Sequence, residues 1–127
     1  MATLIVTYPA EADGQGWLEG KFVQLRLAGR DCLLFAAATR YRYHNQILAR
    51  FLSDQGIAIR WEGDTWQIVD PAGLTVTGGG RFQLDPDSRS LCVWDNSSAY
   101  GRFDAARLAD QLRSGGTPWD RLELTVR

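Results

Sequence analysis

Short apolar runs separated by turn residues predict strands in the first third of the chain. The run at 4–6 precedes Pro9 and a glycine-containing loop, which is typical of a terminal strand followed by a connection. Residues 21–27 mix apolar and polar positions, and residues 28–31 interrupt the pattern before a second apolar run at 32–38. The last two segments therefore predict a β-hairpin.

The period of the pattern then changes. From Tyr43 to Phe51 apolar residues recur at three- and four-residue spacing, and Gly56 ends the run. This spacing is typical of an amphipathic helix, which is predicted over 44–55. His44 is therefore expected in the first helical turn.

Alternating short strands and one more helical segment complete the pattern. Further elements are predicted as strands at 57–61, 65–69, 74–77, 90–94 and 122–126, and as a helix at 103–112. The strands between 57 and 77 are expected to form an added hairpin or meander. The whole pattern predicts an α/β (α+β) fold in which a mixed β-sheet of about six strands carries two main helices.

The composition is that of an ordinary globular protein. The 127 residues are 45% hydrophobic and 23% charged, and the formal net charge is −1. We therefore expect one domain over residues 1–127, monomeric, without the basic field that nucleic-acid binding uses. No apolar run approaches the about 20 residues that cross a bilayer, and no leader-like pattern opens the chain, so we expect a cytoplasmic protein with no membrane partner.

Soft metal ligands are scarce in this sequence. Cys32, His44 and Cys92 are too few and wrongly spaced for a zinc site, so no metal and no other cofactor is expected. Both cysteines lie in apolar stretches and are expected as free thiols without the setting of a catalytic cysteine. The five tryptophans are expected in the core rather than as stacking platforms for bases.

Two residue types occur once each. Of the 14 basic residues, Lys21 is the one lysine and the other thirteen are arginine, and His44 is the one histidine. An ammonium group is a compact point charge that a guanidinium fork does not replace. A histidine ordinarily titrates near neutral pH and is suited to moving a proton in water. A chance surface lysine and a packed histidine are the plain alternatives.

Two glycine- or serine-rich segments could bring the backbone close to a ligand. The triplet at 78–80 before Arg81 requires either a close backbone approach or positive φ, and a flexible turn between strands is its simpler interpretation. The loop at 96–101 lies between a strand and a helix, so its amides could form an anion cradle. Simple N-capping by serine is the competing interpretation of that loop.

These groups together match the needs of phosphoryl hydrolysis. Lys21 and Arg81 would neutralise phosphoryl oxygens, the loop would supply amide donors, and His44 would activate water. Phosphoryl transfer asks the protein mainly for positioning and charge neutralisation.

Four segments in order resemble the phosphohistidine phosphatase (Janus/Ocnus) family. They are 20–27 (GKFVQLRL), 43–47 (YHNQI), 78–82 (GGGRF) and 93–101 (VWDNSSAYG). They are similar to the family's lysine-bearing first core strand, its Tyr-His-Ala-Asp-Ile, its Gly-Gly-Gly-Arg-Ile and its strand ending in Ser-Met-Ala-Tyr-Gly. The resemblance covers about residues 20–126, which would be the core of a phosphohistidine-phosphatase-like domain.

The resemblance implies a metal-independent phosphatase that removes phosphate from phosphohistidine in proteins or from a small phosphoramidate. By that resemblance His44 is the catalytic general base and Lys21 and Arg81 bind the phosphoryl group. Ser97, Ser98 and Ala99 would complete substrate binding with amide and hydroxyl donors.

The chain departs from the family pattern in three places. The family carries an arginine before its histidine, where this chain has Ala36, and Arg40 or Arg42 could replace it. The residues after His44 are Asn45 and Gln46 instead of Ala-Asp. The segment 61–77 is longer and could reshape the mouth of the site. A non-catalytic module that recognises phosphate or other anions is therefore the alternative function.

Overall fold

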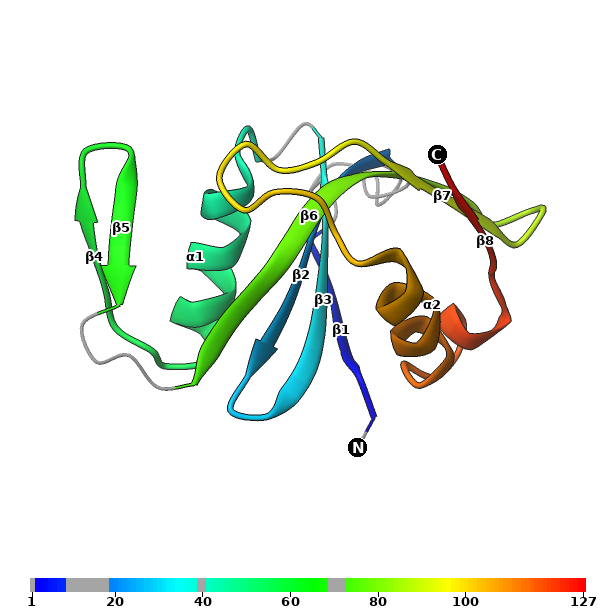
Figure 1. Ribbon diagram of the computed structural model, residues 1–127, viewed down its shortest axis with the longest axis horizontal. Helices are drawn as coiled ribbons and strands as arrows, with labels where there is room; N and C mark the ends of the chain where they lie inside the picture. The colour runs from blue at the N-terminus through cyan, green and yellow to red at the C-terminus, as the bar shows by residue number, and fades with distance from the viewer. Residues whose placement is uncertain (1, 9–18, 39–40, 69–72) are drawn as a thin grey trace.

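A mixed sheet organises the chain in the computed structural model, which describes residues 2–8, 19–38, 41–68 and 73–127 (Figure 1). Within these ranges six strands pair in the order β1-β3-β2-β6-β7-β8. The two outermost pairs, β1 with β3 and β7 with β8, are parallel and the inner pairs are antiparallel. The strands are β1 (Leu4–Tyr8), β2 (Glu19–Leu27), β3 (Arg30–Ala37), β6 (Leu74–Asp85), β7 (Ser90–Trp94) and β8 (Glu123–Val126). The predicted mixed α+β class, with about six strands in the sheet, is confirmed.

One helix covers each face of this sheet. Helix α1 (His44–Asp54) lies on one face and α2 (Ala105–Arg113) on the other, and a 3-10 turn, η2 (Trp119–Arg121), follows α2 (Figure 1). Side chains alternate along the strands, so the apolar residues divide into two clusters. The α1 side buries Tyr8, Val23, Leu25, Cys32, Leu34, Ala36, Ile47, Leu48, Phe51 and Leu52. The α2 side buries Phe22, Leu33, Phe35, Phe82, Leu84, Leu91, Val93, Phe103, Leu108, Leu112 and Trp119.

Local hydrogen bonds set the ends of both helices. The side-chain oxygen of Gln46 accepts from the backbone amides of Arg42 and Tyr43, at 3.0 and 3.1 Å, and thereby starts α1. The side chain of Asp104 accepts from the backbone amide of Arg107 and starts α2. Helix α1 agrees with the predicted 44–55 to within one residue, whereas α2 begins two residues after the predicted 103.

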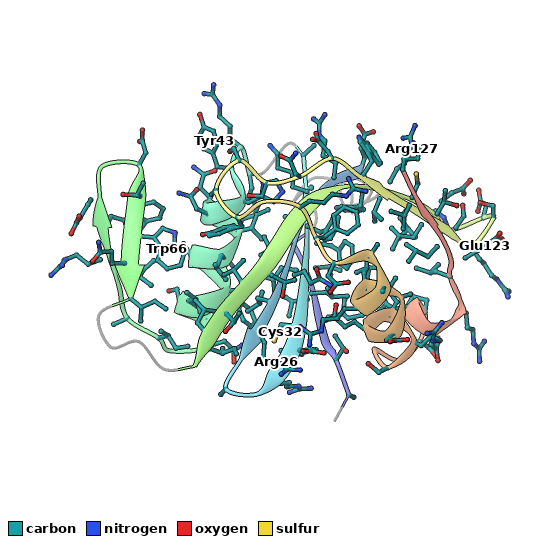
Figure 2. The ribbon with its side chains drawn as sticks, viewed as in Figure 1. Arg26, Cys32, Tyr43, Trp66, Glu123 and Arg127 are labelled. Atoms are coloured by element: carbon teal, nitrogen blue, oxygen red, sulfur yellow. The ribbon has the colours of Figure 1, made fainter. Side chains whose placement is uncertain are left out.

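A separate two-stranded hairpin stands beside α1. Strands β4 (Ile59–Glu62) and β5 (Thr65–Ile68) pair with each other and not with the main sheet (Figure 1). Figure 2 shows Trp66 on the side of the hairpin that faces α1. The added hairpin was predicted, but the strand expected at 74–77 belongs to the long central strand β6 instead.

The glycine triplet at 78–80 is not a turn. It lies inside β6, where all three glycines pair with β2 and Gly79 also bridges to Arg102, and none of the three has positive φ. A Cβ atom on Gly80 would lie 2.6 Å from the carbonyl oxygen of Trp94 and 3.0 Å from the ring of Phe103. The expected flexible turn is therefore wrong, and close packing of other groups against the strand is the reason for glycine here.

The tryptophans and cysteines fit their predictions in part. Trp119 is buried, but 48% of Trp61 is exposed, so the core assignment is wrong for Trp61. Trp17 lies outside the described residues. Cys32 and Cys92 are free thiols, the first buried and the second partly buried. The helices in the described ranges are too short or too polar to cross a membrane.

Candidate functional site

Two cations lie next to each other on the face of the sheet that α1 covers. Lys21 on β2 is directly opposite Arg81 on β6 and opposite Ala36 on β3. Residues that pair directly across strands project from the same face, so both cations lie on the side of α1. Burial lowers the pKa of Lys21, and the charges of Arg81 and Arg42 lower it further. The strand register thus brings two of the predicted site residues together.

The ammonium group of Lys21 reaches the chain segment just before α1. Its Nζ donates a hydrogen bond to the backbone carbonyl of Arg42. The guanidinium of Arg42 lies over the Tyr43 ring, 5.3 Å from the ring centre. Ala36 is fully buried beside Lys21, and Arg40 lies outside the described residues. Of the two arginines that could replace the family's arginine at Ala36, Arg42 is therefore the one that the structure describes, and it lies near Lys21, the neighbour of Ala36.

His44 is held against β6 in one orientation. Its side chain is buried, with 6% exposed, and Nε2 lies 2.9 Å from the carbonyl oxygen of Gly80. A carbonyl oxygen only accepts hydrogen bonds, so Nε2 carries the proton and Nδ1 keeps its lone pair. The second nitrogen can therefore accept a proton from water.

The surroundings keep this imidazole neutral. Burial lowers the pKa of His44 below its ordinary value of 6.5, the hydrogen bond to Gly80 opposes that shift, and the charge of Lys21 adds to it. Smaller effects on the same pKa come from Asp95, which raises it, and Arg81, which lowers it. At neutral pH the group is therefore a neutral base.

Gly79 makes room for the imidazole. A Cβ atom at this position would lie 2.8 Å from Cδ2 of His44 and 2.6 Å from the carbonyl oxygen of Phe22. Neither contact is compatible with a real side chain without movement. The close backbone approach that the triplet predicts is therefore found here, and its partner is the candidate base.

The loop after β7 is closed by its own hydrogen bonds. Ser97 and Gly101 exchange backbone hydrogen bonds of 3.0 and 2.8 Å, and the buried Ser97 hydroxyl accepts from the amide of Tyr100. The amide of Gly79 donates to the carbonyl of Gly101 and ties the loop to β6. Ser97 thus shapes the loop, and its amide is already engaged.

Ser98 and Ala99 are exposed, as are Asn96 and Gly101 at the two ends of this loop. Within the described part of the chain, their backbone amides donate to no other group. The helix start that borders them is that of α1, whereas α2 was expected. At the start of α2, the side chain of Gln24 accepts from the amide of Asp104, and the side chain of Asp104 accepts from the amide of Arg107. The long loop reaches across β6 to the α1 side of the sheet (Figure 1).

These elements enclose a cleft of about 300 Å³. Its lining is Tyr43, His44, Asn45, Asp64, Ser98 and Ala99. A mostly apolar hollow of about 290 Å³ adjoins it, shares Asn45 and Ala99, and continues between α1, β5 and β6. Lys21 and Arg81 lie outside this lining but close enough to shift the pKa of His44.

The hairpin contributes to the cleft through residues that sequence reasoning did not select. Nδ2 of Asn45 donates to the carbonyl of Asp64 at 2.8 Å, and the indole of Trp66 donates to the carbonyl of Asn45 at 2.9 Å. The longer segment 61–77 was expected to reshape the mouth of the site, and the hairpin turn does lie at the cleft. No spacing rule links residue 64 to residue 45, so only the fold brings them together.

In the described part of the chain no three His, Cys, Asp or Glu side chains gather in a way that could hold a metal ion. A comparison with models of known protein families found no match, and no curated protein matched the chain. The resemblance to the phosphohistidine phosphatase family therefore stays a prediction from the four segments.

Proposed function

We propose that this protein hydrolyses phosphoramidates, foremost phosphohistidine in proteins, with water as the nucleophile and with no metal. The observation that carries the proposal is the state of His44. It is buried and neutral, its Nδ1 is free, and it lies beside an open cleft and two cations. Anion binding alone has no need for such a base.

The groups at the site have separate tasks in the reaction. Lys21 and Arg81 attract the phosphoryl oxygens, and the free amides of Ser98 and Ala99 donate to them. A water oxygen attacks phosphorus and gives one proton to Nδ1 of His44. The P–N bond breaks, and its electron pair returns to the leaving nitrogen. Positioning and charge neutralisation are the main demands of this chemistry.

The resemblance supports phosphohistidine as the substrate, and the open cleft offers room for an imidazole on the surface of a partner protein. We place the reaction in the cytoplasm, in keeping with the two free thiols.

Phosphate release from a phosphohistidine peptide, measured with chelator present, tests the function. Wild type should release phosphate, and His44→Ala should lower kcat/KM by about 100-fold or more, the usual share of a general base. Arg81→Ala should raise KM, whereas Arg113→Ala, which removes an exposed arginine from α2, should have no effect. Loss of wild-type activity on addition of chelator would contradict a metal-free reaction.

The alternative is a module that binds phosphate or other anions without turnover. Ala36 favours it, because a buried alanine stands where the family carries an arginine. Such a module would bind inorganic phosphate equally well as wild type and as His44→Ala, and neither protein would release phosphate from the peptide.

A further inference from the structure

The hollow next to the His44 cleft is a groove with mostly apolar walls. Its volume is about 290 Å³, and it shares Asn45 and Ala99 with the cleft, so the two hollows adjoin. The apolar groove is lined by Asn45, Leu48, Thr65, Trp66, Leu74, Val76, Ala99 and Tyr100. The larger side chains of β5, β6 and the loop in this lining are only partly buried. They therefore leave apolar surface open to a ligand.

Strand β5 presents an unpaired edge beside this groove. Within the described ranges the β4–β5 hairpin pairs with no other strand, and its turn has two residues, 63–64. In such a hairpin Glu62 and Thr65, which flank the turn, form a hydrogen-bonded pair, and the pairs then alternate along the ladder. Trp66, opposite Trp61, therefore points its backbone N–H and C=O away from β4. No described backbone group meets them there.

The unpaired edge and the apolar groove lie at the same place. Helix α1 lies between β5 and β6 in Figure 1, and all three elements line the groove. An unpaired strand edge that borders a groove is the setting for strand addition, in which an extended peptide pairs with the edge. Main-chain hydrogen bonds then supply affinity, and pockets for alternate side chains supply specificity. The groove therefore fits an extended segment of polypeptide.

We propose that the apolar groove holds an extended segment of the substrate protein, added as a strand to the edge of β5, with an apolar side chain two residues from the phosphohistidine in the groove. This inference rests on the proposed function and adds how the protein substrate is held. The cleft and the groove follow each other along the hairpin, because Asp64 lines the first and Trp66 the second. Residues two apart in a strand face the same side, about 7 Å from each other.

The alternation of the hairpin decides which neighbours of the phosphohistidine enter the groove. Trp66 and Ile68 pack against the core on the α1 side, whereas Thr65 and Gln67 are exposed. An added strand continues this alternation, so residues two positions from the phosphohistidine face the groove and those next to it face solvent. Partial burial of a leucine side chain in the groove gives a preference of about tenfold.

The first experiment measures binding of peptides that cannot be hydrolysed. A triazole side chain bearing a phosphonate replaces phosphohistidine. Leucine stands two positions away on both sides in one peptide and directly adjacent on both sides in the other, and serine fills the remaining places. The two peptides have equal composition and charge. Wild type should bind the first about tenfold more tightly. Equal affinities, or binding of neither peptide, would overturn the groove.

A matched pair of variants tests the wall of the groove. Val76→Thr replaces a methyl group of the wall with a hydroxyl and should reduce the preference about fourfold, the contribution of one buried methylene group. Thr75→Val makes the reverse change at an exposed position on the other face of β6 and should leave the preference unchanged. Equal effects of the two variants would contradict a role for this wall.

Amide hydrogen exchange tests the strand addition itself. The first peptide should slow exchange of the Trp66 amide, which points away from β4 at the groove. The Trp61 amide points outward on the opposite edge of the hairpin and should exchange as before. Slowed exchange of both amides, or of neither, would contradict addition of a strand at β5.

Turnover separates this inference from the proposed function. With true phosphohistidine in both peptides, leucine two positions away should also raise kcat/KM. No hydrolysis of either peptide, with the binding preference intact, would overturn the phosphatase reaction alone. Equal kcat/KM and equal binding of the two peptides would overturn the groove alone.

Discussion

Gly79→Ala is the substitution that best tests how the backbone positions His44. The added Cβ would lie 2.6 Å from the carbonyl oxygen of Phe22 and 2.8 Å from Cδ2 of His44. The first contact is with backbone and is relieved only if the strand pair β2–β6 shifts. Overpacking of this kind costs about 1–3 kcal/mol of the free energy of unfolding. The second contact moves the imidazole away from the carbonyl of Gly80, which holds it at 2.9 Å.

The effect on activity should exceed the effect on folding. A displacement of a reacting group by about 1 Å lowers turnover by about 100-fold. We would measure the free energy of unfolding in urea and kcat/KM for a phosphohistidine peptide on the same preparation. Gly115→Ala is the control, because its Cβ crowds the side chain of Ile5 near the end of α2, away from the site.

The two variants separate stability from positioning. Both should be destabilised, and only Gly79→Ala should lose turnover after correction for the unfolded fraction. Full turnover by folded Gly79→Ala protein would refute the claim that glycine is needed here to seat His44. Equal losses of turnover in both variants would show that the activity follows stability alone.

Three further predictions concern the pKa of His44 and the buried side chain of Gln24. Burial and the charge of Lys21 lower the pKa of His44, so kcat/KM in a pH–rate profile should rise with pH through a pKa below 6.5. Lys21→Ala should move this rise in kcat/KM to higher pH, and a move to lower pH would contradict the reasoning. Because the pKa of His44 is lower in the folded protein, the unfolded chain binds more protons than the folded one near and below pH 6.5. The free energy of unfolding should therefore decrease as pH falls through that range, and His44→Gln should make this decrease smaller. Gln24→Leu should cost about 2–3 kcal/mol of the free energy of unfolding, because it leaves the Asp104 amide (2.7 Å from Oε1) and the Gln111 side-chain oxygen (2.8 Å from Nε2) without partners. Gln83→Leu, at an exposed position of β6, is the control, and similar urea midpoints for both variants would refute this.

Local patterns in the sequence were sufficient for the elements and for the class of fold. The three- and four-residue apolar spacing before Gly56 placed α1 to within one residue, and the apolar run 90–94 placed β7 with its bounds. The rarity of one lysine and one histidine singled out two side chains that the fold brings to the same region. These features are local, and they reflect the period of backbone geometry and residue chemistry.

The tertiary structure decided what depends on contacts between distant segments. The glycine triplet has the composition of a turn, but its pairing with β2 makes it part of a long strand inside the sheet, where His44 packs against Gly79. Likewise, nothing in the spacing of residues 45 and 64 predicts that the hairpin turn meets the first turn of α1. Strand register and the path of long loops arise from packing between distant segments of the chain. The sequence by itself therefore determined the secondary-structure elements and the candidate residues, whereas the fold determined which of these residues lie close together.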